Sequence, residues 1–289
     1  MKATPFLLHA LSPLHAGTGR AADIIDLPTA RMKATGIPFV PGSSIKGVLR
    51  DSCRDVDSEK TEAVFGPSDD AGLHAGALVV GDARLLLLPV RSFRGTFAWT
   101  TSPLLLTLAK RDLAEVAGPS SVPKLDGRGA LVPASSACIH KGQVFLEDID
   151  LGAKTSEEVR AWASWLVPHV SPGEDILTRR FVVVDDETMA FLCETALQVD
   201  ARVCIDEDTR TVKSGALWLE ESLPPETVLL GLLAAERSRR PGSSLAPEQV
   251  LQFVLAREQA LQFGGKATTG RGRCRIVPLP AQEGTHARR

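Results

Sequence analysis

Strand-like and helix-like segments follow one another along this chain without a regular strand–helix–strand rhythm. Short apolar runs typical of strands lie at 5–11 and 77–89, and the second is a long stretch rich in Leu and Val that we expect to be buried. This irregular order favours an α+β fold over a doubly wound parallel sheet. The chain has 289 residues, which is enough for one large domain or two small ones.

Helix-capping signals predict helices at 43–53, 102–117, 155–167 and 247–263. Ser43 and Ser102 are the expected N-caps of the first two helices, and Pro103 suits the first helical position. The pattern Thr155-x-x-Glu158 predicts a capping box at the start of the third helix. The fourth helix is expected to end at the two glycines of 264–265.

The bulk properties limit the classes of function. The formal net charge is −2, so any nucleic acid must meet locally concentrated basic residues rather than a uniformly basic surface. The five cysteines are scattered and form no CxxC pair, which argues against structural zinc and a disulfide framework. No apolar run approaches the ~20 residues of a membrane helix, so we expect a cytoplasmic protein without a membrane partner.

One turn pattern occurs twice, at 41–47 and at 89–95, and reads P-x-x-S-apolar-basic-G. Each copy brings together a serine hydroxyl, backbone N–H groups near a glycine and a cation, which are the groups that bind a phosphate oxygen. The alternative is that two unrelated turns share common turn residues. The pattern alone leaves both interpretations open.

A glycine-rich basic segment, 264–273, is the third element of this kind. It holds four glycines, together with Lys266, Arg271 and Arg273, and lacks the G-K-[ST] of a phosphate-binding P-loop. A flexible helix stop is the alternative. The chain has no Tyr and few other aromatic residues, so we expect contact with phosphate and sugar rather than base stacking. We expect the three basic elements to line one track for a ribose–phosphate chain.

The order of these motifs resembles the RAMP superfamily of CRISPR proteins, and more closely the repeated backbone subunit of the type III-B Cmr effector complex. Each matching stretch is weak alone, but together they span residues 14 to 270 in the order found in that family. The stretches are 14–19, 23–28, 38–50, 81–84, 89–99, 223–227 and 264–270.

The resemblance implies a modified ferredoxin-like (RRM-like) palm with an inserted β-hairpin thumb, which we expect at about 182–199. It implies a single domain over 1–280, followed by a disordered tail at 281–289. It also implies that copies stack head-to-tail along a guide crRNA, with target single-stranded RNA and other Cmr subunits as further partners. The thumb is expected to kink the guide–target duplex at regular intervals.

The resemblance implies endoribonuclease activity on the bound target. Asp26 matches the aspartate that carries cleavage in this subunit type, with a weakly held divalent ion, Mg²⁺ or Mn²⁺, for which Asp26 is the expected ligand. The RNA's own 2′-hydroxyl is the expected nucleophile. His15 and Glu226 match positions near that site and are candidates for proton transfer or charge stabilisation.

The resemblance also implies a set of residues that contact RNA: Ser44, Lys46, Arg50, Arg91, Arg94, Gly265, Lys266 and Arg271. Two rival functions share these contacts. One is a purely structural RNA-binding subunit, and the other is a guide-RNA processing endonuclease of the same superfamily. A third and more distant alternative is the equivalent subunit of the type III-A complex.

Overall fold

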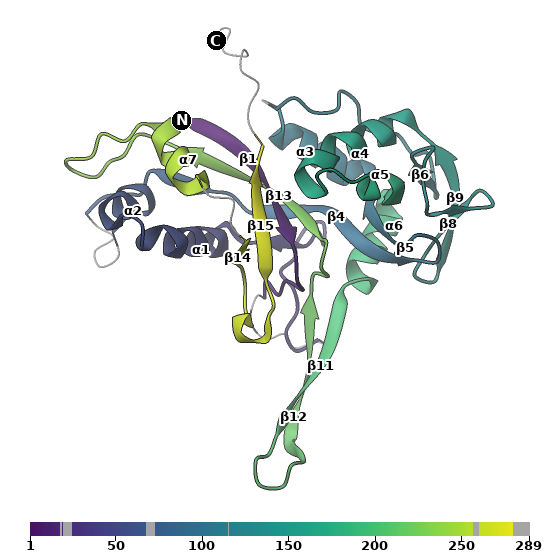
Figure 1. Cartoon of the computed structure of the whole chain (residues 1–289). Coiled ribbons are helices and arrows are strands. Elements are labelled where there is room, and N and C mark those ends of the chain that lie inside the picture. Colours follow the sequence, from purple (N-terminus) through teal and green to yellow (C-terminus); the bar gives the residue numbers. More distant parts are fainter. Residues whose placement is uncertain (18, 20–24, 68–72, 115, 257–259, 280–289) are drawn as a thin grey trace.

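The computed structural model describes residues 1–17, 19, 25–67, 73–114, 116–256 and 260–279. The tail predicted to be disordered, 281–289, lies outside these residues. Within the described ranges, none of the helices is both long and apolar enough to cross a membrane. Figure 1 shows two lobes side by side, with a long hairpin projecting from between them.

The first lobe, the palm, is built on an antiparallel sheet. Its strands lie in the order β14 (Ala260–Gln262), β15 (Arg273–Pro278), β1 (Lys2–Ala10), β13 (Val228–Ala235) and β4 (Ala83–Ser92). Helix α1 (Gly42–Arg54) follows β1, and helix α7 (Pro247–Leu255) follows β13. This β-α-β-β-α-β order is that of a ferredoxin-like fold, so the predicted fold class is confirmed.

Both faces of the palm sheet are covered, which explains its unbroken apolar runs. Successive side chains of a strand point to opposite faces. Leu8 accordingly belongs to the core that includes Ile45 of α1 and Val250 of α7, whereas Leu7 belongs to the core that includes Trp99 and Trp162 of the second lobe. The site residues are therefore carried by a sheet that is fixed from two sides.

Helix α1 begins one residue earlier than its sequence suggests. Its N-cap is Pro41, and the Asp82 carboxylate, rather than Ser43, accepts the N–H of Gly42 at 2.7 Å. The predicted cap at Ser43 is therefore wrong, because a distant carboxylate satisfies the helix end. Short elements surround this helix: β2 (Phe39–Val40), α2 (Ser58–Phe65) and β3 (Leu78–Val80).

The second lobe continues the same sheet. The first part of β4 pairs with β13, and the part from Leu88 onward pairs with β5 (Thr96–Thr101). Beyond β5 come β10 (Phe181–Val184), β6 (Ala130–Val132), β9 (Ile149–Thr155), β8 (Gln143–Leu146) and β7 (Ile139–His140). The helices of this lobe are α3 (Pro103–Asp112), α4 (Glu157–Val170), α5 (Ile176–Arg180) and α6 (Asp186–Thr195).

Three helix predictions need correction at their ends. Ser102 caps α3 as expected, but the helix ends at Asp112 instead of continuing to 117. Ser156 rather than Thr155 caps α4, and Pro168 lies inside that helix. Helix α7 ends at Leu255, and β14 occupies part of the range that we assigned to it.

The projecting hairpin, the thumb, consists of β11 (Gln198–Ile205) and β12 (Val212–Ser222). The predicted position at about 182–199 is wrong, since most of that range forms β10 and α6. The reason is local, because the Asp185 side chain accepts the N–H of Thr188 and starts a helix where we expected a strand to continue.

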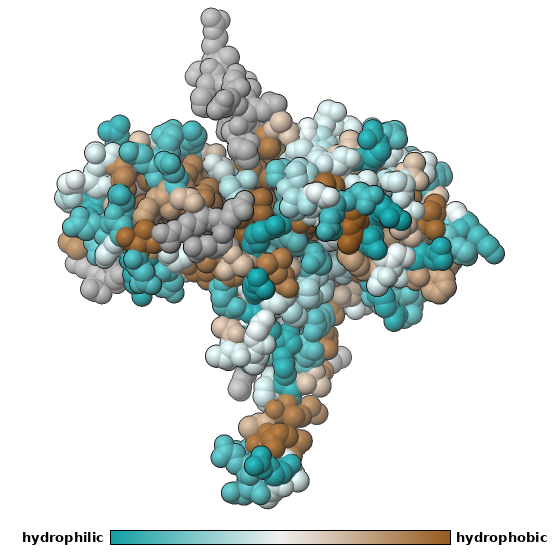
Figure 2. Space-filling model, viewed as in Figure 1, coloured by the Kyte–Doolittle hydropathy of each residue, from teal (hydrophilic) through white to brown (hydrophobic). Residues whose placement is uncertain are grey.

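The two faces of the thumb differ in chemistry. Val199, Val203 and Leu217 are exposed on one face, and Figure 2 shows an apolar band just above a hydrophilic tip. Asp200 and Arg202, one residue out of step with these, belong to the other face. That polar face lies against the glycine-rich segment.

Candidate functional site

Asp26 lies at the surface beside the base of the thumb. Its Oδ2 accepts the backbone N–H of Leu219 at 2.8 Å. The next residue, Leu27, donates its N–H to the Leu219 carbonyl and accepts the N–H of Glu221. The loop is thus pinned to β12 by three hydrogen bonds, which leaves an exposed carboxylate in a fixed place.

His15 reaches the same stretch of β12 from within the protein. It is buried, and its Nδ1 lies 2.7 Å from the Glu221 carbonyl oxygen. A carbonyl oxygen can only accept, so Nδ1 carries the hydrogen. A Cβ on Gly17 would lie 2.5 Å from the ring nitrogen Nε2, so the chain passes close over the imidazole.

The glycine-rich segment packs directly on His15. The His15 carbonyl accepts the N–H of Gly265 at 3.1 Å. Gly264 has φ +70°, and a Cβ there would lie 2.2 Å from the same carbonyl oxygen, so this position requires glycine. The short 3-10 turn η1 (Ala267–Thr269) follows, and Lys266 before it adopts a left-handed backbone with φ +67°.

A cluster of charges joins this segment to the thumb. The Glu220 carboxylate is buried, and three cations surround it: Arg271 at 3.4 Å, Lys266 at 3.6 Å and Arg202 at 3.9 Å. Arg271 also pairs with Asp200 at 2.5 Å. Burial alone would raise the pKa of Asp200, but the hydrogen bonds from Arg271 and Gln198 outweigh it and lower that pKa.

Lys266 and Arg271, the two cations of this segment that were predicted to bind RNA, differ in exposure. Arg271 is 6% exposed and donates to Asp200 and Ser222, so its guanidinium is used inside the protein. The predicted contact of Arg271 with RNA stays a prediction, and it would require this buried side chain to be reached by the ligand. The Lys266 side chain is 36% exposed and its amine lies 5.8 Å from the centre of the Trp218 ring, which leaves it accessible to a ligand.

Glu226 lies in the turn that follows β12, and its role near Asp26 stays a prediction. Its carboxylate lies 2.9 Å from His9 Nε2, and its carbonyl accepts the Trp99 indole N–H. Arg275 lies 3.4 Å from His9 Nδ1 and can only donate, so His9 gives its own hydrogen to Glu226. The residues from Leu219 to Ser222 run as extended strand, about 3.3 Å per residue, between the Asp26 anchor and the turn that holds Glu226.

A second glutamate, Glu220, lies at the base of the thumb, and sequence reasoning missed it. Its neighbour Glu221 is also buried, and it accepts Arg31 at 2.8 Å and the N–H of Thr29. Two acids in succession on a strand usually indicate a solvated edge. The presence of the nearby basic segment could not be inferred from this local pattern.

The first serine turn begins helix α1, which contacts the strand before the glycine-rich segment. Ser44 is exposed, and α1 packs against β14, the strand that leads into that segment. Burial, followed by the charge of Arg50, lowers the pKa of Lys46. Arg50 donates to the carbonyl of Gly66 at 2.9 Å, so it is partly used to join α1 to the end of α2.

The second serine turn lies elsewhere. Asp82, just before β4, bonds the start of α1, whereas the turn with Arg94 follows Ser92 at the other end of β4. A strand of ten residues is about 30 Å long, so the two turns do not adjoin. Arg91 pairs there with Glu147 at 3.3 Å and with Asp148. The second turn therefore does not adjoin the first, and one track through all three elements stays a prediction.

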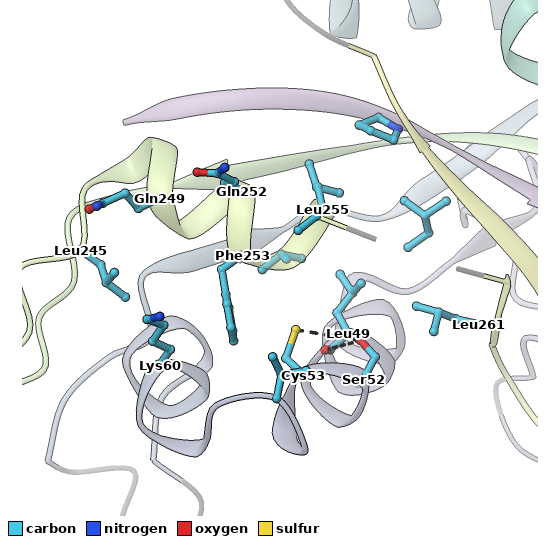
Figure 3. Close-up of a pocket in the computed structure, with 15 residues that line it drawn as sticks. Leu49, Ser52, Cys53, Lys60, Leu245, Gln249, Gln252, Phe253, Leu255 and Leu261 are labelled. Carbon is cyan, nitrogen blue, oxygen red and sulfur yellow. Dashed lines mark hydrogen bonds between the residues drawn. The ribbon is translucent and has the colours of Figure 1, made fainter. Parts of the chain in front are cut away.

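A groove of mixed apolar and polar lining lies apart from these charges. It has a volume of about 400 Å³ and lies between α1, α2, α7 and the ends of β14 and β15. Figure 3 shows Phe253 pointing from α7 into this space toward the helix that carries Leu49 and Cys53. Among the described residues that line it, Lys60 alone is charged, so the groove offers little for acid–base chemistry.

The described residues around Asp26 do not by themselves form a site for a divalent ion. Within the described ranges, no group of three or more His, Cys, Asp or Glu side chains is placed to bind a metal. Glu220 and Glu221 already face cations, and Asp26 supplies one carboxylate.

Comparison with known proteins agrees with this architecture. The profile of the RAMP superfamily matches residues 7–275. The CRISPR system Cmr endoribonuclease Cmr4 of Pyrococcus furiosus is 31% identical over 301 aligned positions, covering all of both chains.

Solved structures give the same result. A crystal structure of oligomeric Cmr4 from Pyrococcus furiosus, 25% identical, has a TM-score of 0.75 and covers 98% of this chain and 100% of its own. A subunit of a type III-B Cmr-beta complex bound to cognate target RNA, 20% identical, has a TM-score of 0.77 over 96% of this chain and 98% of its own, which shows the shared fold. The chain therefore belongs to the RAMP superfamily and, within it, to the family of the Cmr4 proteins.

Proposed function

We propose that this protein is a crRNA-binding backbone subunit of a type III-B Cmr effector complex, and that it cuts the bound target RNA with Asp26. The full-length similarity to a protein named as a Cmr endoribonuclease supports this function. The observation that carries it is the exposed Asp26 carboxylate, fixed to the thumb base by Leu219. We place the protein in the cytoplasm, as a subunit that polymerises head-to-tail along the guide.

The guide contacts come from α1 and the glycine-rich segment. Ser44 and Lys46 near the start of α1 offer a hydroxyl and a cation close to a helix N-terminus, which favours phosphate. Lys266 adds an exposed cation beside the thumb. Gly265 acts by its small size, since its N–H is already given to His15. Because these contacts read phosphate, binding is independent of base sequence.

The chemistry follows from a single positioned carboxylate. Asp26 accepts the proton of the target's 2′-hydroxyl, and the 2′-oxygen attacks the adjacent phosphorus. The bond from phosphorus to the 5′-oxygen breaks, and that oxygen takes a proton from water. The products are a 2′,3′-cyclic phosphate and a 5′-hydroxyl. The thumb aids this step by aligning the attacking and leaving oxygens.

The decisive experiment replaces Asp26→Asn in the assembled complex. Asparagine keeps the size and an oxygen that can accept the Leu219 N–H, but it cannot take the proton. We expect unchanged target binding and a cleavage rate lower by at least about 100-fold, the usual contribution of a general base. Unchanged cleavage by the variant would exclude the catalytic role and favour the purely structural subunit.

Two controls separate the remaining functions. A target with 2′-deoxyribose at the cut position should bind and stay intact, because the nucleophile is missing. The isolated protein incubated with CRISPR repeat RNA should leave it uncut, whereas cutting would indicate a guide-processing enzyme. The need for a divalent ion stays a prediction. Comparing the cleavage rate of the complex in Mg²⁺ or Mn²⁺ with its rate in excess chelator tests this dependence.

A further inference from the structure

Two accessible cations at the thumb base share one carboxylate oxygen. Lys266 Nζ and Arg202 Nε lie 3.6 Å and 3.9 Å from Glu220 Oε2, and Arg271 approaches the other oxygen at 3.4 Å. Lys266 and Arg202 are therefore close enough for one phosphate group to reach both. Neither oxygen of Glu220 receives a hydrogen bond, although both are buried. The contacts are ion pairs at long range, which a closer anion can replace.

The three cations differ in exposure. Arg271 has a side chain that is 7% exposed, and Asp200 holds it at 2.5 Å. The side chains of Lys266 and Arg202 are 36% and 33% exposed. If these two turn toward a ligand, Glu220 keeps Arg271, so no buried charge is left without a partner. The two outer cations can therefore change partner at low cost.

The balance of charge in this cluster also favours an added anion. Arg202, Lys266 and Arg271 carry three positive charges against two negative charges on Glu220 and Asp200. One positive charge is thus in excess within the cluster. A phosphodiester, which carries one negative charge, would balance it.

The aromatic ring of Trp218 lies beside this cluster of charges. Trp218 is the cross-strand partner of Arg202, and the Lys266 amine lies 5.8 Å from the centre of its ring. Directly opposite residues on paired strands have neighbouring side chains on one face. The ring and both cations therefore lie on the polar face of the thumb, where an RNA strand beside Asp26 would pass.

We propose that Arg202 and Lys266 together form a site for one RNA phosphate at the base of the thumb. Glu220 and Asp200 hold the cations ready while the site is empty. This inference rests on the proposed RNA-binding function and extends it, because it assigns Arg202 a ligand and makes the two cations one site. The site reads the phosphate alone, so it takes any base sequence.

Salt dependence of RNA binding by the full chain tests this site. A single-stranded RNA of mixed sequence is the probe, and affinity is measured against salt concentration. Each phosphate neutralised on a single strand contributes about 0.7 to the slope of log affinity against log salt. We expect Arg202→Gln and Lys266→Gln each to bind severalfold more weakly and to lose about 0.7 in slope.

The double variant decides whether the cations share a phosphate. A shared phosphate predicts that Arg202→Gln with Lys266→Gln loses about 0.7 in slope, the same as each single variant. A loss of about 1.4 would mean two separate phosphates and would overturn the shared site. Arg202→Lys and Lys266→Arg, which keep the charge, should retain the wild-type slope, and thermal unfolding checks that all variants fold.

Arg111→Gln is the matched control, since Arg111 is an exposed cation on α3, away from the thumb. It should leave both affinity and slope unchanged. If the wild type binds RNA but neither single variant changes the slope, the site is overturned and the proposed function stands. If the wild type with its partner subunits binds no RNA, the proposed function fails, and this site fails with it.

Discussion

At the scale of single residues, the site depends on where glycine is irreplaceable. Gly264 and Gly215 adopt nearly the same left-handed backbone, with φ of +70° and +73°. They differ in surroundings, because a Cβ at 264 would strike the His15 carbonyl whereas nothing lies near 215. Comparing alanine substitutions at the two positions therefore separates the free-energy cost of the left-handed backbone from the cost of the steric clash.

We expect Gly264→Ala to destabilise the protein by more than about 3 kcal/mol, the upper range for a strained residue alone. Gly215→Ala should cost about 1 kcal/mol, from the left-handed backbone alone. Urea unfolding of both variants measures the difference. Equal losses of stability would show that the close approach between Gly264 and His15 is not significant.

A second prediction at this scale concerns how the contribution of Asp200 to stability depends on pH. The lowered pKa of Asp200 means that its contribution to stability is full above its ordinary value of 3.8 and is lost as pH falls through the folded value. At pH 7, Asp200→Asn should reduce the free energy of unfolding by about 1–2 kcal/mol, through the loss of a charged hydrogen bond. At a second pH, below 3.8, the difference in stability between the variant and the wild type should be smaller, because the Asp200 carboxylate is protonated as pH falls through its folded pKa.

Denaturant unfolding at both pH values measures this change. Asp148→Asn is the control, because Asp148 is fully exposed and its nearest ion pair, with Arg91, is at 4.0 Å. It should match the wild type at every pH. A constant difference between Asp200→Asn and the wild type down to pH 2 would contradict the role of the Arg271 pair.

Some of the site residues could be predicted because their pattern is visible within a short stretch of sequence. A glycine-rich basic run is visible in the sequence, and so is an aspartate among turn residues. The burial of Arg271 was not predictable, because it depends on Asp200 and Glu220, which arrive from the thumb. Glu220 was missed for the same reason, since its place among three cations depends on strand register, which is a long-range property.

At the scale of elements, helix starts with a local cap were the most predictable. Ser102 acts through its own side chain, so its role could be read from nearby residues. The cap of α1 was missed because Asp82 is forty residues away. The thumb was misplaced because both 182–199 and 198–222 hold strand-like residues, and the Asp185 cap decides between them.

The thumb carries a natural reporter. Cys204 is exposed, whereas Cys53, Cys138, Cys193 and Cys274 are buried, and burial raises the pKa of Cys193 and Cys274 to about 12. Thiolate is the reactive form, so we expect a maleimide to modify one cysteine in the native protein. Mass spectrometry of the labelled protein measures this, and Cys204→Ser is the control.

Guide RNA should alter the rate of that labelling, because it passes along the thumb in the proposed complex. Slower modification of Cys204 in the assembled complex than in the free chain is the expected result. Rapid labelling of two or more thiols in the folded protein would contradict the burial described for the other four.

At the scale of the whole molecule, self-association should depend on RNA. Head-to-tail contacts build an open array, and RNA-binding surfaces of like charge on neighbouring copies repel until a guide neutralises them. We expect light scattering to give a low mass for the isolated chain and a large increase on addition of guide RNA. Equal masses with and without RNA would contradict this view.

The whole fold was predictable in class, since an irregular order of strands and helices and the family motifs both indicate α+β. The union of the two lobes was not, because it depends on β4, whose first part pairs with β13 and whose second part pairs with β5. A run of apolar residues indicates that a strand is buried. It does not indicate at which residue the strand changes from one neighbouring strand to another.

Because β4 belongs to the sheets of both lobes, it limits how the lobes can move relative to each other. The lobes are not joined by a linker about which one could swivel, so a partner that grips the outer lobe also fixes the direction in which the thumb projects (Figure 1).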